Sequence, residues 1–246
     1  MKKNNFQIQL GDHSIPCKEY LPGGEVKLVV LGVHGFGGDK ESSVLRALAG
    51  QLEPLGGALV CFDFPCHGES RAPDEMLGVE ICRSDLLAMA DEVRRRFPDA
   101  QKGIFATSFG GYITMLSLDL LNDFSIVLRS PAVTMAESFL TIIPDRESFF
   151  EKGSALCGFE RKMLLTTAFH DDLKAHTVPL PDRPVLIIHG TKDDIVPFSA
   201  VSEMAGQSDF ITLCPIEGAD HRFKRRGHLE SMLRIAVGWF TAGGTL

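Results

Sequence analysis

Residues 103–111 read GIFATSFGG, a short apolar run followed by Ser108 and a glycine pair. The apolar run is typical of a buried strand, and Gly110–Leu121 has helical spacing, so Ser108 falls at a strand-to-helix turn. Ala106 and Gly110 stand two residues before and two after the serine, where a strand and helix that meet sharply leave room only for small side chains. The pattern predicts a nucleophile elbow. The alternative, if the motif stood alone, is a plain glycine-rich turn.

Apolar runs and amphipathic stretches alternate on both sides of this turn. The runs are nearly continuous in apolar residues, which is typical of parallel strands covered on both faces. The expected strands are Phe6–Leu10, Ile15–Leu21, Val26–Val33, Ala58–Phe64, Gly103–Thr107, Ser125–Arg129, Pro184–His189 and Phe210–Ile216. The expected helices are Glu41–Leu55, Val79–Phe97, Gly110–Leu121, Phe198–Gly206 and Gly227–Thr241. The fold class is therefore α/β, an open and mostly parallel central sheet with helices on both faces.

One segment breaks this alternation. Pro131–Pro181 contains no strand-like run, and its apolar residues suggest short helices instead. A structureless loop of that length inside a domain is improbable. We expect residues 132–181 to form a small inserted cap within a single domain spanning residues 1–246.

Composition narrows the functional classes. The chain has 246 residues, of which 44% are hydrophobic and 23% charged, and its net charge is −7. This composition is that of a globular protein, and a nucleic-acid partner is not expected without an excess of positive charge. Met1–Leu10 lacks the apolar core of a signal peptide, and no apolar run approaches the roughly 18 residues that span a bilayer. We expect a protein without a membrane partner.

The six cysteines are scattered, without a CxxC pair or a Cys/His cluster at zinc-ligand spacing. Reduced, mostly buried thiols in a cytoplasmic protein are the expectation, with no metal site.

Two further loops contain candidate catalytic groups. His34-Gly35-Phe36-Gly37-Gly38 follows an early strand, and its backbone can approach Ser108 because of its glycines. The N–H groups of Phe36 and Phe109 are the candidate oxyanion donors. Among eight histidines, His221 follows the last strand and precedes the last helix, where its imidazole can reach the elbow.

The other histidines have weaker context. A structural hydrogen-bonding role is expected for His34 and His67, and a packed position for His189. Surface or cap positions are expected for His13, His170, His176 and His228.

The base needs an orienting carboxylate, and Asp193 and Asp194 follow the penultimate strand. Two adjacent side chains cannot both point at His221. Asp193 is preferred, with Asp194 solvated or capping the next helix. The chain order Ser, Asp, His is typical of this architecture.

Five motifs, in this order along the chain, resemble those of the α/β-hydrolase superfamily. They are His34–Gly38, Asp63–Ser70, the Ser108 elbow, Gly190–Pro197 with Asp193, and Gly218–His221. The cap after the sixth strand is similar to that of bacterial cinnamoyl or feruloyl esterases. In this superfamily the Asp63–Ser70 stretch is a structural turn, and we assign it no chemistry.

The resemblance implies hydrolysis of a small-molecule carboxylic ester through an acyl-enzyme on Ser108, with His221 as base, Asp193 as its orienting acid and no cofactor. A serine peptidase or thioesterase on the same three residues is the alternative. A non-catalytic ligand-binding module is the alternative from another class, although a binder has no need of the whole set.

The cap phenylalanines Phe139, Phe149, Phe150, Phe159 and Phe169 are expected mainly to form the cap's own core, with Phe149 and Phe150 as candidates for an acyl pocket. The basic cluster Arg222, Lys224, Arg225 and Arg226 beside His221 is expected to be a solvated face.

Overall fold

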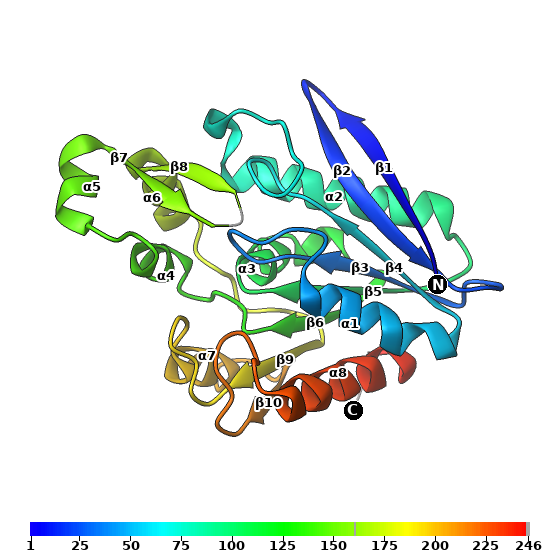
Figure 1. Ribbon diagram of the computed structural model, residues 1–246. Coiled ribbons are helices and arrows are strands. Elements are labelled where there is room, and N and C mark those ends of the chain that lie inside the picture. The colour runs from blue at the N-terminus through cyan, green and yellow to red at the C-terminus, as the bar shows by residue number, and fades with distance from the viewer. Residues whose placement is uncertain (160, 245–246) are drawn as a thin grey trace.

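The computed structural model describes residues 1–159 and 161–244. A sheet of eight strands, in the order β1-β2-β4-β3-β5-β6-β9-β10, runs through the middle of this part (Figure 1). Its strands are β1 (Lys2–Leu10), β2 (His13–Leu21), β3 (Leu28–Val33), β4 (Gly57–Phe62), β5 (Gln101–Thr107), β6 (Phe124–Arg129), β9 (Val185–Gly190) and β10 (Ile211–Ile216). The pairs β1/β2 and β2/β4 are antiparallel, whereas β4, β3, β5, β6, β9 and β10 are parallel. The predicted mostly parallel sheet is confirmed.

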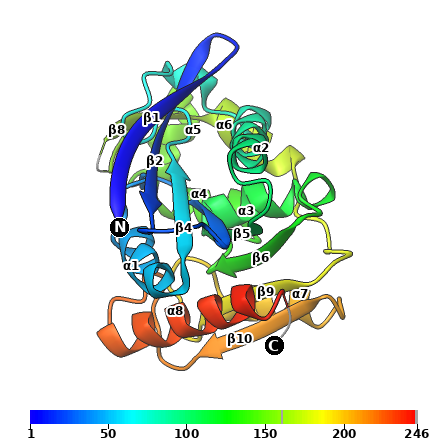
Figure 2. The same ribbon diagram turned by 90° about the vertical axis from the view of Figure 1, so that its right-hand side faces the viewer.

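Helices cover both faces of this sheet (Figures 1 and 2). The helices outside the inserted segment are α1 (Ser43–Leu52), α2 (Val79–Arg96), α3 (Phe109–Met115), α7 (Phe198–Ala205) and α8 (Arg226–Thr241), with 3₁₀ turns at Glu53–Leu55, Asp74–Met76 and Leu118–Leu120. Side chains of α1 and α8 pack on one face of the sheet, and those of α2, α3 and α7 pack on the other. Every residue of β3, β4 and β9 is consequently buried, which explains why their sequences show no alternation of apolar and polar residues.

The helix after Ser108 is shorter than predicted, since α3 ends at Met115 rather than at Leu121. The hydroxyl groups of Thr114 and Ser117 donate to the carbonyls of Gly110 and Ile113, at 2.7 and 2.9 Å. Hydroxyls that bond back to the preceding turn compete with regular helical bonding. The chain then continues as the 3₁₀ turn Leu118–Leu120.

Between β6 and β9 the chain leaves the sheet and forms α4 (Met135–Thr141), α5 (Arg146–Lys152), β7 (Ser154–Gly158), β8 (Lys162–Thr166) and α6 (Thr167–Ala175). The expectation that this segment holds no strand was wrong, because β7 and β8 pair as an antiparallel hairpin. Cys157 and Met163 point inward, while Leu156 and Leu164, which face each other across the hairpin, are exposed. Each strand has three consecutive apolar residues, Ala155–Cys157 and Met163–Leu165, so these five-residue strands lack the alternation that would have revealed them.

In the described part of the chain, no helix combines the length and apolarity that crossing a bilayer requires.

Candidate active site

Ser108 occupies the sharp turn between β5 and α3, and its backbone φ is +48°. Residues other than glycine rarely adopt this region, so the turn is strained. A Cβ atom at Gly110 would lie only 2.5 Å from the carbonyl oxygen of His34. Ala106, on the other side, is completely buried. Small residues at both positions are therefore required by packing, as the sequence pattern predicts.

Three side chains from separate loops form a chain of hydrogen bonds at the carboxyl ends of the strands. Ser108 Oγ lies 3.1 Å from His221 Nε2, and His221 Nδ1 lies 2.7 Å from Asp193 Oδ2. Ser108 is partly exposed, whereas His221 is buried. In this arrangement an imidazole can take the proton of a serine hydroxyl while a carboxylate orients the ring. The structure thus brings together the three residues that the sequence singles out.

The Asp193 side chain is fully buried. Its Oδ1 accepts hydrogen bonds from the backbone N–H groups of Ile195 and Val196, at 2.9 and 2.8 Å. Burial acts to raise the pKa of Asp193, but the hydrogen bond from His221 and the two backbone donors outweigh it and hold that pKa below its usual value. This carboxylate is ionised at neutral pH. Asp194 is exposed and does not cap α7.

The loop after β3 lies against the serine turn. A Cβ atom at Gly35 would be 3.2 Å from Ser108 Cβ. His34 holds the loop in place through two hydrogen bonds. Its Nδ1 donates to the Gly35 carbonyl at 2.8 Å, and its Nε2 accepts from Phe64 N–H at 3.1 Å. Burial lowers the pKa of His34 to about 4, which keeps the ring neutral for these two roles.

The two candidate oxyanion donors remain available. Among the described residues, neither Phe36 N–H nor Phe109 N–H has a protein acceptor. Phe109 is the first residue of α3, where an N–H group has no partner within the helix. Both groups can therefore donate to a bound oxygen.

A buried ion pair holds this loop against the 63–70 turn. Lys40 Nζ lies 2.7 Å from Asp63 Oδ2, and both side chains are almost completely buried. Asp63 also accepts from the backbone N–H groups of Lys40 and Glu69, at 2.7 and 2.9 Å. A Cβ atom at Gly68, where φ is +49°, would lie 2.4 Å from Asp63 Cγ. Lys40 was missed by sequence analysis because a single lysine after a glycine-rich loop carries no signal of burial.

Phenylalanine rings gather around Phe36. The centroid of its ring lies 5.3 Å from that of Phe109, 5.7 Å from Phe159, 5.9 Å from Phe169 and 6.0 Å from Phe139. A Cβ atom at Gly37, where φ is +72°, would meet the Phe159 ring at 2.4 Å. The hairpin of the inserted segment thus packs directly on the loop that holds Phe36.

Phe149 and Phe150, the candidates for an acyl pocket, both lie in α5 of the inserted segment. Phe149 is buried and packs against Phe139 and Phe150, as a member of the inserted segment's own core. Phe150 is 52% exposed on α5. Neither ring packs against Phe36 or Phe109 in the described structure. The Phe159 ring packs instead on Phe36, in the loop that approaches Ser108 at Gly35.

Three of the remaining histidines, His67, His189 and His13, form hydrogen bonds inside the structure. His67 Nδ1 donates to the Pro65 carbonyl, and His189 Nε2 donates to the Val196 carbonyl, at 2.8 and 3.0 Å. His13, expected at the surface, is instead nearly buried, with its Nε2 2.8 Å from Asp85 Oδ1. Burial raises the pKa of Asp85 to about 6.

The basic cluster after His221 is solvated, as expected. Arg222, Lys224, Arg225 and Arg226 are all exposed, and Arg226 pairs with Glu230 at 2.8 Å.

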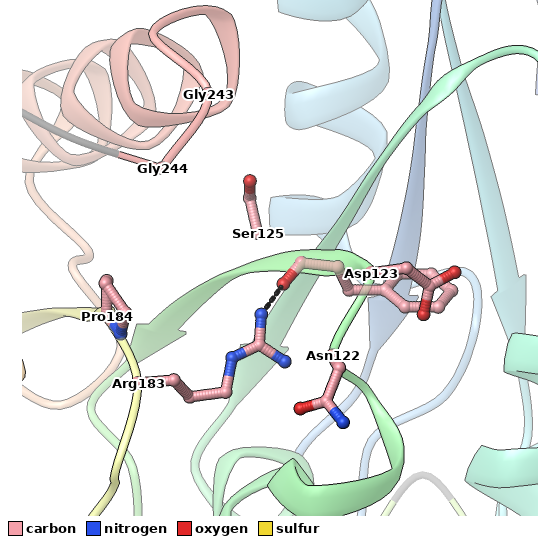
Figure 3. A pocket seen from close by; sticks show the side chains of 8 residues that line it. Asn122, Asp123, Ser125, Arg183, Pro184, Gly243 and Gly244 are labelled. Carbon is pink, nitrogen blue, oxygen red and sulfur yellow. Dashed lines mark hydrogen bonds between the residues drawn. The ribbon is translucent and has the colours of Figure 1, made fainter.

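Two hollows lie away from the serine. One, of about 290 Å³, lies at the amino ends of β6 and β9 and is lined by residues 122–125, Arg183, Pro184 and Gly243–Gly244 (Figure 3). Figure 3 shows Arg183 reaching into it, where Nη2 donates to the Phe124 carbonyl at 2.6 Å. The other, of about 340 Å³, lies beside Lys40 and Arg161. The candidate site is therefore defined by side-chain geometry and not by either hollow.

Three features together define an α/β-hydrolase: the mostly parallel sheet, the strained Ser108 turn, and the loops that carry Ser108, Asp193 and His221 in this order along the chain. Residues 24–154, just over half of the chain, match the family model Hydrolase_4, described as serine aminopeptidase, S33. The chain belongs to this family.

Relatives and solved structures agree with this assignment. The palmitoyl-protein thioesterase ABHD10, mitochondrial, of Homo sapiens is 22% identical over an alignment of 194 positions, which covers 73% of this chain and 62% of that protein. The chain thus spans less than two thirds of its curated relative.

Among solved structures, Est1E from Butyrivibrio proteoclasticus with ferulic acid bound has a TM-score of 0.80 at 21% identity, covering 96% of this chain and 99% of that one. Mouse alpha/beta hydrolase domain-containing protein 10 has a TM-score of 0.78 at 18% identity, covering 97% and 99%. These likenesses establish the fold.

Proposed function

We propose that the protein hydrolyses carboxylic esters through an acyl-enzyme on Ser108. The observation that carries the proposal is the unbroken hydrogen-bond chain from Ser108 Oγ through His221 to the buried Asp193 carboxylate. Each member comes from a different loop, so packing of the strand ends alone does not account for their alignment.

In the proposed reaction, Ser108 Oγ attacks the ester carbonyl while His221 Nε2 takes the hydroxyl proton. The N–H groups of Phe36 and Phe109 stabilise the negative oxygen of the tetrahedral intermediate. His221 then gives its proton to the leaving alcohol, and the acyl group remains on Ser108. Water, deprotonated by His221, attacks the acyl-enzyme, and the acid leaves with Ser108 restored. Asp193 keeps Nδ1–H directed inward and stabilises the imidazolium.

A fluorophosphonate tests this assignment, because it forms a covalent adduct only with an activated serine. We expect one adduct per chain on the wild type, located at Ser108 by peptide mapping, and none on Ser108→Ala. A folded wild type that forms no adduct would support the non-catalytic binding module instead.

The leaving group is a separate question, since the same three residues can cleave esters, thioesters and amides. A thioester is the second candidate, because a curated relative is named a palmitoyl-protein thioesterase and because apolar rings surround Phe36. The family description, serine aminopeptidase, makes an amide the third. Comparing kcat/KM for a matched ester, thioester and anilide of one acyl group separates these activities. We expect the ester to be cleaved faster than the anilide.

A further inference from the structure

Arg129 is the last residue of β6, the strand between the Ser108 strand β5 and the Asp193 strand β9. It is 7% exposed, and no carboxylate of the described residues lies within ion-pair distance of it, although Asp193 attracts its charge at longer range. Its Nε has no hydrogen-bond partner in the same part of the chain. Burial lowers the pKa of Arg129 to about 10, so the guanidinium is still charged at neutral pH. Burying a cation without a direct ion-pair partner is unfavourable for folding, so such a residue calls for another explanation.

Arg129 forms hydrogen bonds with backbone groups of both Ser108 and His221. Its backbone carbonyl accepts a hydrogen bond from Ser108 N–H at 3.0 Å. Its side-chain Nη2 donates to the carbonyl oxygen of His221 at 2.8 Å. One residue thus connects the main chains that carry Ser108 Oγ and His221 Nε2.

The His221 loop is shaped to receive this side chain. The guanidinium carbon lies 5.4 Å from the centre of the Phe223 ring, a favourable cation–π arrangement. Phe223 is buried and has a φ of +54°, which is unusual for an aromatic residue. Within the loop, Asp220 accepts from the N–H groups of Arg222 and Lys224, which fixes the local shape. The bond between Ala219 and Lys192 ties the loop to the Asp193 side, whereas Arg129 ties it to the Ser108 side.

We propose that Arg129 is a positioning residue, which sets the distance between Ser108 Oγ and His221 Nε2 by binding both main chains. This inference rests on the proposed function, in which His221 is the base. A base displaced by about 1 Å can lower a rate by about 10²-fold. Replacing Arg129 with an apolar side chain of similar length removes a buried charge, but it also removes the hydrogen bond to His221 and the attraction of Asp193, so these effects on stability oppose each other.

The test compares Arg129→Met with Arg183→Met. Arg183 is a matched control, since it also binds backbone carbonyls, those of Leu121 and Phe124, but at the amino ends of the strands (Figure 3). For Arg129→Met we expect kcat for p-nitrophenyl acetate to fall about 10²-fold with little change in KM, and the melting temperature to change little. For Arg183→Met we expect a lower melting temperature and an unchanged kcat.

Arg129→Lys provides a second variant, because lysine keeps the charge but lacks the planar fork of donors. We expect its kcat to lie between those of the wild type and Arg129→Met. An Arg129→Met enzyme with wild-type kcat, or one that loses activity only in proportion to a lower melting temperature, would overturn the inference. Fluorophosphonate labelling of wild-type Ser108 separates this result from failure of the proposed function, since an unlabelled wild type refutes both and a labelled one leaves only Arg129 in question.

Discussion

Single residues determine whether the hydrogen-bond chain forms. Asp193 and Asp194 are identical in chemistry and adjacent in sequence, yet one is fully buried against His221 and the other is exposed. The difference arises from Ile195 and Val196, whose N–H groups turn toward Asp193. The sequence could favour Asp193 from its place in the loop. Its two backbone donors could not be predicted, because they depend on how residues 193–196 turn.

We therefore expect Asp193→Asn to lower kcat by about 10⁴-fold, as neutralising a carboxylate in this role does. Asn cannot stabilise the imidazolium, and its amide favours the wrong tautomer of His221. Steady-state kinetics on a p-nitrophenyl ester measure the effect, with Asp194→Asn as the matched control. Equal losses in the two variants would contradict the geometry.

The connections between elements set the shape of the site. The Ser108 turn and the glycine-rich loop are short, local motifs, and the sequence predicted both. The β7–β8 hairpin was missed, and so was the approach of Phe159 to Gly37. That approach joins residues far apart in the chain, and only the folded inserted segment brings them together.

Phe159 is expected to determine which acyl groups are accepted, because its ring packs on Phe36, in the loop that approaches Ser108 at Gly35. Phe159→Ala should change the ranking of acetyl, butyryl, octanoyl and feruloyl esters, by roughly 1 kcal/mol for each methylene group of the substrate that the ring shields from water. The measurement is kcat/KM across the series. Phe150→Ala is the control, since that ring is exposed on α5 and should leave the ranking unchanged. A uniform loss across all esters in Phe159→Ala would mean that the ring only holds the hairpin.

The buried Lys40–Asp63 ion pair should contribute more to the free energy of unfolding than an exposed ion pair does. Lys40→Met leaves the Asp63 carboxylate buried without its cation, which typically lowers the free energy of unfolding by about 3–5 kcal/mol. Urea denaturation measures the change. Lys18→Met is the control, because Lys18 pairs with the more exposed Glu41 and should lose under about 1 kcal/mol. Similar losses in both variants would contradict the role of burial.

Across the whole molecule, burial distinguishes most of the cysteine thiols from the partly exposed Ser108 hydroxyl. Composition and periodicity predicted the layers and the burial of most thiols, since these follow from many residues together. Cys17, Cys61, Cys66, Cys82 and Cys157 are buried, and Cys214 is partly exposed. Burial raises the pKa of Cys17 and of Cys66 to about 12, and raises the pKa of the other four thiols as well.

We expect these thiols to be unreactive in the folded protein, because the thiolate is the reacting form. In a titration with Ellman's reagent near pH 8, at most Cys214 should react before unfolding, and all six cysteines should react in guanidinium chloride. Rapid reaction of two or more thiols in the native protein would contradict this prediction.

The position of the hollow around Arg183 has a consequence for inhibitor discovery. It opens at the amino ends of β6 and β9, whereas Ser108 and His221 stand at the carboxyl ends. A compound chosen to fill that hollow would raise the melting temperature on binding without blocking the nucleophile. Thermal-shift screening alone would therefore select ligands that do not inhibit, and competition with a serine-directed covalent probe is the assay that would recognise those that do.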